Sequence, residues 1–552
     1  MKKRFLAWAR ERWFLVLIVF LYSILAFFNL GDIKAPQTFY TFSARTDFAI
    51  VLPREEEVSK ILFYTGRTTS DFNLSYSLKK SGVGCNCEKC QNIAIVNPND
   101  FNKEKEFDVS GPFRWVEIDL SDIKTSMIMM RSNCCREIQF GEFAVFDKNG
   151  EKINNIKVGI PSSGFIAEEE YINELTDESD VVPTKETPRN SSYFDEIYFT
   201  QTAYEYANGL PGYENVHPPL GKILLAAPIM LTGQMTPFTW RIMSVVAGII
   251  IIIVVYYIAV LLFKNNLYAN FAAVLTSLSG LHFVQTRVGT VDSFLCLFTV
   301  LSFYSMFKFI NANGKLRYFI LSGLFFGSAV SVKWSGAFGG IGLSILFIHF
   351  LKKNNLFKKK NLKKAGVWAI KGLLFFILVP SVIYCSSYLL FSKSTEAYSL
   401  SDIYTQGEHL LNYHANERTP HSAASPWFTW PIGLVPFLYY YDETTGASIS
   451  LTSNYVLSYI SVIALITTAY IAIKRRDKIS IYILVAYLSL LLPYAFIQRP
   501  MFLYHYLPAS CFAILAILNM VRIFKAPKYL VYTILLTTLI SFIILYPKMA
   551  GI

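Results

Sequence analysis

Two adjacent carboxylates, Asp195 and Glu196, are the residues of this chain whose type and setting best suit chemistry. A positioned carboxylate can take the proton of an attacking hydroxyl group and so act as a general base. The pair stands among aromatic residues, before a proline-containing segment, His217–Lys222, that opens a long apolar region. Ionisable groups at a bilayer surface are costly unless they serve a pathway or a reaction. We therefore expect an acid–base site at the surface of a membrane domain.

Other polar side chains stand at the ends of apolar segments further along the chain. They are Arg241, Arg287, Asp292, Lys333, Arg499 and His505. Fixed cations suit a reaction that builds negative charge on a leaving group, because preorganised groups stabilise such charge best. Ordinary explanations also exist. An arginine at a helix end can extend to a lipid headgroup, and Arg287 and Asp292 can form a structural ion pair. The prolines after His217 suit a helix start, and His505 can pack between its neighbouring tyrosines.

The composition indicates a membrane protein. The chain has 552 residues, of which 53% are hydrophobic, and this share is too high for a soluble domain. Its net charge of +12 would suggest nucleic acid in a soluble protein. Here the basic residues cluster between apolar segments, as the positive-inside rule describes. We therefore expect a multi-pass protein of the cell membrane with no nucleic-acid partner.

Eleven apolar segments are predicted to cross the membrane. The first, 13–30, follows five basic residues and has no clean small-residue cleavage site, which indicates an uncleaved span. The others are 239–263, 267–284, 290–310, 316–332, 336–351, 367–391, 453–473, 479–496, 502–521 and 529–547. Several are shorter than the about 20 residues that a spanning helix needs, so their bounds are soft. The short apolar segment 218–233 is placed at the membrane surface as a juxtamembrane helix.

The distribution of basic residues sets the expected topology. With the N-terminus in the cytoplasm, the lysine-rich loop 352–364 and most other basic loops fall inside, and the C-terminus falls outside. Counting 218–233 as a span would move loop 352–364 outside, which contradicts the rule. In the expected topology all the polar residues named above gather on the outer face.

Residues 31–165 differ in kind from the rest of the chain. Short alternating runs bounded by turn residues predict strands. The runs are Asp47–Leu52, Lys60–Thr65, Phe72–Leu78, Phe113–Leu120 and Ile138–Asp147. They predict an extracytoplasmic β-sandwich, and two of them resemble strands of discoidin-like, galactose-binding-like sandwiches. Residues 168–180 then carry seven acids and no base, which is typical of a solvated linker.

Five cysteines lie in the external region, where disulfides persist. They are Cys85, Cys87, Cys90, Cys134 and Cys135. The spacing of the first three could hold a metal. However, the adjacent residues Cys134 and Cys135 are poorly placed to supply the remaining ligands of a zinc site. We expect disulfides rather than a metal, with the pairing open and at least one thiol left over. The remaining cysteines, Cys296, Cys385 and Cys511, lie in apolar spans and are expected to be packing residues.

Six segments, in this order, resemble the landmarks of the protein O-mannosyltransferases. They are Phe194-Asp195-Glu196, Val216–Lys222, Thr239-Trp240-Arg241, Gln285–Ser293, Ser331–Gly336 and Met501–Pro508. The resemblance covers about residues 190–550. That family belongs to the membrane glycosyltransferases of GT-C type, which use polyprenyl-phosphate sugars. The resemblance thus implies a polytopic α-helical membrane fold of GT-C type, with the β-sandwich inserted before the acidic pair.

The resemblance also implies roles for the site residues. Asp195 would be the general base, supported by Glu196, in an inverting transfer of a hexose, expected to be mannose. Donor-phosphate or substrate contacts would come from Arg241, His217, Lys222, Arg287, Asp292, Lys333, Arg499 and His505. No cofactor or metal is expected, although His409, His414, His421 and Glu408 make a metal site in the external loop conceivable. The expected organisation is span 1–30, sandwich 31–165, acidic linker 166–192, catalytic loop 193–238, helices 239–391, external loop 392–452 and helices 453–552.

Two departures from the family pattern leave the acceptor open. The 392–452 loop is too short for the β-trefoil (MIR) domain of the eukaryotic members, and the sandwich is an insertion; both suit a bacterial relative. The expected acceptors are Ser and Thr hydroxyls of exported proteins, and a lipid or cell-envelope glycan is the alternative. A transporter or lipid flippase is more distant, because the sequence has no internal repeat and its charges gather at one face. The oligomeric state stays open.

Overall fold

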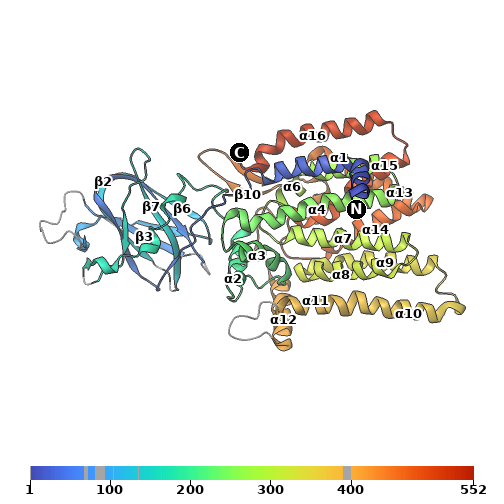
Figure 1. Ribbon diagram of the computed structural model, residues 1–552, viewed down its shortest axis with the longest axis horizontal. Helices are drawn as coiled ribbons and strands as arrows, with labels where there is room; N and C mark the ends of the chain where they lie inside the picture. Colours follow the sequence, from blue (N-terminus) through green and yellow to red (C-terminus); the bar gives the residue numbers. More distant parts are fainter. Residues whose placement is uncertain are drawn as a thin grey trace. The chain divides into compact units, whose positions relative to one another are not determined.

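The computed structural model describes residues 2–67, 72–80, 94–102, 105–132, 134, 136–162, 164–389 and 399–552. It divides into two compact units (Figure 1). The helical unit comprises Met1–Leu30, Glu205–Pro228 and Arg241–Ile552. The β unit comprises Gly31–Tyr204 and Ile229–Trp240.

Within the described residues, eight helical segments are long and apolar enough to cross a membrane. They contain α4 (Pro237–Phe263), α7 (Asp292–Asn311), α9 (Phe338–Lys353), α10 with α11 (Leu362–Leu373 and Val379–Leu389), α13 (Tyr455–Arg475), α14 (Lys478–Leu491), α15 (Leu507–Ile523) and α16 (Lys528–Ala550). Shorter apolar helices are Arg12–Phe27, within α1 (Lys2–Phe27), α3 (Leu220–Thr232) and α8 (Leu316–Val332). The polytopic helical fold is therefore confirmed, while the count of eleven spans stays a prediction.

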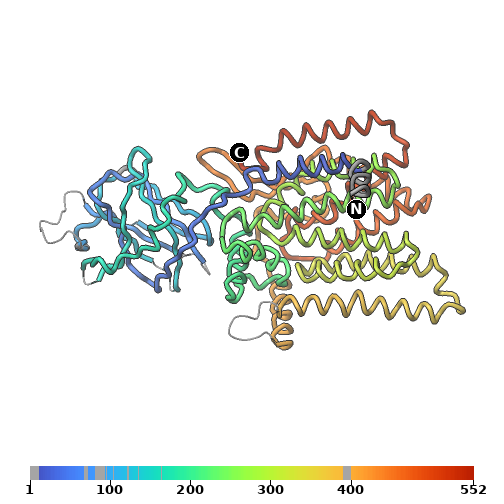
Figure 2. The backbone as a smooth tube through the Cα atoms, in the orientation of Figure 1, coloured from blue at the N-terminus to red at the C-terminus, as the bar shows by residue number. Residues whose placement is uncertain are grey.

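One predicted span, 267–284, is two short helices, α5 (Asn266–Ser277) and α6 (Gly280–Gln285). The break occurs where Ser279 caps α6 by accepting a hydrogen bond from the His282 amide. Glycine is required next to it, because a Cβ at Gly280 would lie 2.4 Å from the carbonyl oxygen of Thr452. By contrast, α10 and α11 join through a π-helical turn at Leu374–Leu378 and form one continuous rod (Figure 2).

The helices differ in how deeply they are buried. Within an 18-residue apolar window of each segment, 78% of the residues are buried inside the protein for α7 and for α15, but only 6% for α10 with α11. Helix α7 packs against α8, and α15 packs against α13 and α14. Helices α7 and α15 therefore form the core of the helical unit. An apolar helix that is largely exposed, such as α10 with α11, must face lipid instead.

The β unit is built on a seven-stranded antiparallel sheet with the order β1-β7-β2-β6-β3-β5, in which β8 pairs with β2. The strands are β1 (Tyr40–Phe42), β2 (Asp47–Thr65), β3 (Phe72–Leu78), β5 (Lys105–Val109), β6 (Trp115–Ser132), β7 (Ile138–Asp147) and β8 (Lys157–Gly159). A separate pair joins β4 (Ala94–Ile95) and β9 (Phe165–Ile166). Phe48, Phe63, Phe140 and Phe143 pack together in the core of this unit.

The predicted strands Phe72–Leu78 and Ile138–Asp147 coincide with β3 and β7. Two other predicted strands, Asp47–Leu52 and Lys60–Thr65, are parts of the single strand β2. The chain passes Pro53 without ending the strand, because the register with β6 shifts between Val51 and Glu56, and a bulge is where a sheet tolerates proline. Because one sheet contains all the long strands, the predicted discoidin-like sandwich is not confirmed.

The acidic segment predicted as a solvated linker packs on the β unit instead. Leu175 is fully buried, and Glu178 Oε2 accepts hydrogen bonds from the backbone N–H groups of Gln37 and Thr38 at 2.7 and 3.0 Å. The Glu178 N–H in turn donates to Glu142 Oε2 at 2.9 Å. Burial, together with the charges of Asp177 and Glu178, raises the pKa of Glu142 to about 7.

This raised pKa predicts a pH-dependent contact between the acidic segment and the sheet. Between the ordinary value near 4.5 and about 7, the folded state binds a proton at Glu142 that the unfolded state has lost. The contribution to stability is therefore present at low pH and is lost as the pH rises through 7. We expect hydrogen exchange of residues 173–181 in the full chain to be faster at pH 8 than at pH 5.5, after correction for intrinsic rates. Glu142→Gln should remove most of that difference, and an equal difference in the variant would contradict the assignment.

Candidate active site

The acidic pair stands at the start of helix α2 (Glu196–Ala207) in the β unit. Phe194 has φ of +54°, and this turn leads into the helix, where the carbonyl oxygen of Asp195 accepts the N–H of Tyr198 at 3.1 Å. The Asp195 side chain is half-buried, at a helix N-terminus that favours its negative charge. Asp195 is therefore partly exposed at the start of α2, and its role as the general base stays a prediction.

Glu196 is buried and holds the local structure. Its Oε2 accepts the indole N–H of Trp240 at 3.3 Å and the backbone N–H of Tyr193 at 3.4 Å. These contacts tie the turn before α2 to the first turn of α4. The predicted support of Asp195 by Glu196 stays a prediction.

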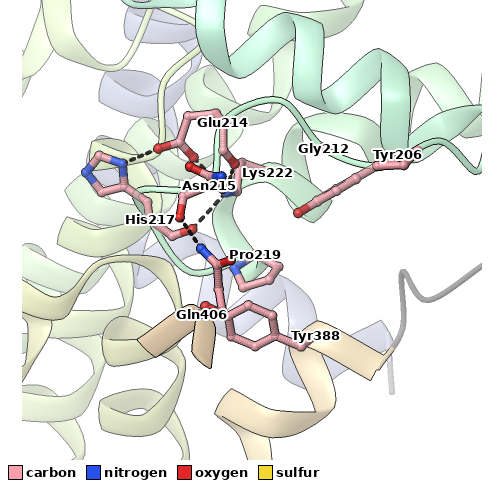
Figure 3. Close-up of a pocket in the computed structure, with 10 residues that line it drawn as sticks. Tyr206, Gly212, Glu214, Asn215, His217, Pro219, Lys222, Tyr388 and Gln406 are labelled. Carbon is pink, nitrogen blue, oxygen red and sulfur yellow. Dashed lines mark hydrogen bonds and ion pairs between the residues drawn. The ribbon is translucent and has the colours of Figure 1, made fainter. Parts of the chain in front are cut away.

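A buried charge cluster organises the loop that precedes α3 (Figure 3). The Lys222 ammonium donates to Glu214 Oε2 at 2.6 Å, to the Glu214 carbonyl oxygen at 2.6 Å and to the His217 carbonyl oxygen at 2.7 Å. These acceptors match the three N–H groups of an ammonium. Lys222 therefore holds the loop, and a direct contact of Lys222 with a substrate stays a prediction.

Glu214 also fixes the protonation of His217. Its Oε1 lies 2.7 Å from His217 Nδ1. Burial alone would raise the pKa of Glu214, but the charge and hydrogen bond of Lys222, together with the hydrogen bond from His217, lower it to about 2. Burial lowers the pKa of His217, so the imidazole is neutral near pH 7. Because a carboxylate only accepts, Nδ1 carries the proton and Nε2 is left as an acceptor.

Removing Glu214 should destabilise the protein, because it leaves the Lys222 charge buried without its partner. Breaking one side of a buried ion pair typically costs about 3–5 kcal/mol. We expect Glu214→Leu to lower the thermal unfolding midpoint of the detergent-solubilised protein, followed by tryptophan fluorescence. The matched double variant Glu214→Leu, Lys222→Met removes both charges and should recover most of the loss. An unchanged midpoint in the single variant would contradict the description of this cluster.

Lys333 lies between α8 and α9 and forms the second buried ion pair of the site. Its Nζ is 3.0 Å from Oδ1 of Asp292, the first residue of α7, and each side chain is 8% exposed. The ammonium also stands 5.3 Å from the ring centre of Tyr504, which is a favourable cation–π arrangement. Asp292 therefore pairs with Lys333 rather than with Arg287.

A cavity of about 710 Å³ opens beside these groups in the helical unit. Its polar lining includes His217, Lys333, His414, Arg418, Arg499 and His505, and no described lining residue is an acid. Its apolar lining includes Val330, Phe338, Leu411, Phe496, Ile497 and Met501. Such a combination suits an amphiphile with an anionic headgroup and an apolar tail. His505 is buried and forms part of the cavity wall. Its ring stacks on that of Trp430, with 5.8 Å between the two ring centres.

Arg241 and Arg287 lie at a different place, the end of α1. Arg287 donates to the carbonyl oxygens of Ala26 at 3.2 Å and Phe28 at 2.7 Å, and Arg241 donates to that of Leu30 at 2.8 Å. The last carbonyl groups of a helix have no intrahelical partner, and cations there are stabilising. Neither arginine is among the residues that line the cavity. Their predicted contact with the donor phosphate stays a prediction.

Matches to two family models show which protein family this chain belongs to. Residues 187–392 match the model of dolichyl-phosphate-mannose-protein mannosyltransferase, and residues 400–552 match that of the C-terminal four-transmembrane region of protein O-mannosyltransferase. The chain belongs to the protein O-mannosyltransferase family. All the candidate residues described above from Asp195 onward fall within the two matched regions, and the seven-stranded sheet precedes them.

Relatives and solved structures agree with the family. The polyprenol-phosphate-mannose–protein mannosyltransferase of Mycolicibacterium smegmatis is 24% identical over 403 residues, which cover 60% of this chain and 76% of that protein. The Corynebacterium glutamicum protein of the same name is 24% identical over 319 residues, covering 46% and 61%. The Saccharomyces cerevisiae protein O-mannosyltransferase Pmt1–Pmt2 complex bound to the sugar donor has a TM-score of 0.58 at 15% identity, covering 65% of this chain and 87% of that chain. This likeness confirms the predicted GT-C type fold.

The structure adds site residues that the sequence prediction missed. Glu214 had a visible signal, since it is an acid three residues before His217, and Tyr504 lies within the landmark segment Met501–Pro508, whereas Arg418 had none. His414 was considered only as part of a possible metal site, but it contacts Arg499, while His409 contacts Asn215 and His421 stacks on Phe437. Cys134 is a free thiol, and Cys85, Cys87, Cys90 and Cys135 lie outside the described residues, so their pairing stays open.

Proposed function

We propose that this protein transfers mannose from a polyprenyl-phosphate carrier to Ser or Thr hydroxyl groups of exported proteins, with inversion at the anomeric carbon. The observation that carries the proposal is the cavity beside His217, which joins a cationic lining without acids to an apolar lining. The names of the relatives supply the sugar and the acceptor class, since they describe polyprenol-phosphate-mannose–protein mannosyltransferases.

The reaction needs two kinds of help from the protein. The acceptor hydroxyl oxygen attacks the anomeric carbon and loses its proton, and Asp195 is the proposed general base, with Glu196 in support. The bond between that carbon and the phosphate oxygen breaks, so polyprenyl phosphate leaves with an additional negative charge. Lys333 and Arg499, with the neutral His217 beside them, are proposed to stabilise that charge, because preorganised cations act best on charge that develops in the transition state. No metal is part of this proposal.

The donor would bind with its phosphate at the basic residues and its chain along the apolar wall. The polyprenyl chain is insoluble in water and stays in the bilayer, so the reaction must occur at the membrane surface. With the N-terminus in the cytoplasm, the proposal places the catalytic face and the β unit outside, where exported proteins pass.

The proposal is tested by identifying the acceptor. Membranes that contain the protein would receive labelled polyprenyl-phosphate mannose and exported proteins of the same cell, and the products would be separated into protein, lipid and envelope glycan. Label on Ser or Thr of protein, in the anomeric configuration opposite to that of the donor, is the expected result. Label confined to lipid or glycan would reject the protein acceptor, and retained configuration would reject the single displacement.

A further inference from the structure

Helix α12 (Leu400–Asn416) is a short amphipathic helix that carries His414 into the wall of the cavity. Ser399 and Asp402 form a capping box at its start, and Ile403 and Leu410 bury one face. Its apolar and polar stripes therefore fix which side of the helix faces the protein. His414 is half-buried and lies beside His217, with 5.7 Å between the two ring centres.

The contacts of His414 allow only one state of its ring. Nδ1 lies 2.8 Å from Arg499 Nη1, and a guanidinium can only donate. Nδ1 must therefore carry a lone pair, which leaves the proton on Nε2. That nitrogen lies 2.9 Å from the carbonyl oxygen of Val216, which can only accept. His414 is thus neutral, with Nε2 protonated, and bridges a donor on one side to an acceptor on the other.

The electrostatic surroundings favour the same neutral state. Burial, followed by the nearby charge of Arg499 and the nearby His217, lowers the pKa of His414 to about 4; Lys333 acts in the same direction, and the Val216 carbonyl opposes it. A protonated ring would turn Nδ1 into a donor that faces the Arg499 guanidinium. The bridge therefore persists through the neutral pH range.

The bridge joins two chain segments that are far apart in sequence. Val216 directly precedes His217, and Arg499 follows the helical segment that contains α14, so His414 connects the loop that carries His217 to the loop that carries Arg499. Among the described residues no carboxylate lies within ion-pair distance of Arg499. Glu417 is nevertheless near enough that Arg499, after the hydrogen bonds with Thr419, helps to lower the Glu417 pKa. At the cavity, the bond to His414 limits the directions that the guanidinium can take.

We propose that His414 is a positioning residue of the donor site, which holds the Arg499 guanidinium towards the lipid phosphate and the His217 loop against it. The inference rests on the proposed donor chemistry but does not need the sugar or the acceptor. It concerns the anionic headgroup alone, so its direct readout is the affinity for polyprenyl phosphate. The uncharged polyprenol offers a matched ligand that lacks that headgroup.

Two substitutions at His414 separate positioning from simple packing. In His414→Gln, Oε1 can accept from Arg499 while Nε2 donates to Val216, so both hydrogen bonds are kept. In His414→Phe a ring of similar size is kept and both bonds are lost. We expect His414→Phe to weaken polyprenyl phosphate binding by about tenfold or more, the range for a hydrogen bond to a charged group. His414→Gln should bind nearly as well as the wild type, and polyprenol affinity should change little in either variant.

The experiment measures the dissociation constant of polyprenyl phosphate for the full chain in detergent, by fluorescence of tryptophans such as Trp334 in the cavity wall, with the thermal midpoint recorded in parallel. In an Arg499→Gln background, His414→Phe should have little further effect, because the two residues act through one contact. Equal affinities of wild type and His414→Phe, or equal losses in His414→Phe and His414→Gln, would overturn the inference. A wild type that binds the lipid phosphate but never transfers mannose would reject the proposed function and leave the role of His414 standing if the two variants differ as expected.

Discussion

Asp195→Asn is expected to reduce mannose transfer by about 10²–10⁴-fold, the usual effect of removing a general base. Asparagine keeps the shape of the side chain at the start of α2 but cannot take the proton of the acceptor hydroxyl. The measurement is the initial rate of label transfer from polyprenyl-phosphate mannose to protein, in membranes with matched amounts of wild type and variant.

Glu196→Gln is the matched control for this variant. The amide oxygen of glutamine can still accept the Trp240 indole N–H that Glu196 holds at 3.3 Å, so the turn before α2 should persist and the loss of rate should be clearly smaller. Equal transfer by Asp195→Asn and wild type would contradict the assignment of the base. A larger loss in Glu196→Gln than in Asp195→Asn would move the base to Glu196.

Lys333→Met should lower the rate of transfer by about 10²–10³-fold, the effect typical of losing one group that stabilises transition-state charge. The substitution also leaves the Asp292 carboxylate buried without its partner at 3.0 Å, which destabilises folding. The two effects are separable, because Lys333→Met, Asp292→Asn removes both charges. We expect the double variant to recover the thermal midpoint and to stay inactive. A double variant that transfers mannose at the wild-type rate would remove Lys333 from the site.

Hydropathy predicted the long helices well and their interruptions poorly. The predicted span 239–263 differs from α4 by two residues at its start, because a long apolar run in lipid can only be a helix. The break between α5 and α6 was missed, although Ser279 caps α6; what requires glycine beside this cap is the close approach of Thr452 to Gly280. That approach is a tertiary contact, which no local pattern carries.

The β unit shows the same limit. Alternation located β3 and β7 because each strand buries one face. Pro53 was taken as a strand end, but the bulge against β6 lets β2 continue past it. The acidic segment was taken as solvated because its charge hides the buried contact of Leu175 and the hydrogen bonds that Glu178 accepts from Gln37 and Thr38.

For the site, the motifs identified residues but not their partners. Lys333 and Arg499 do line the cavity together with His217 and His505. Arg287 instead binds the carbonyl end of α1, and Lys222 binds its own loop. A basic residue at a membrane end can meet a phosphate, a carboxylate or a helix end, and the choice depends on which segments the fold brings beside it.

The most direct test of the account is a structure of Asp195→Asn with polyprenyl-phosphate mannose bound, because the inactive variant should trap the donor. The account predicts the phosphate in contact with Lys333 and Arg499, and the polyprenyl chain along Phe338 and Leu411. A donor whose phosphate lies at another place, such as Arg287 and the end of α1, would contradict the assignment of the cavity.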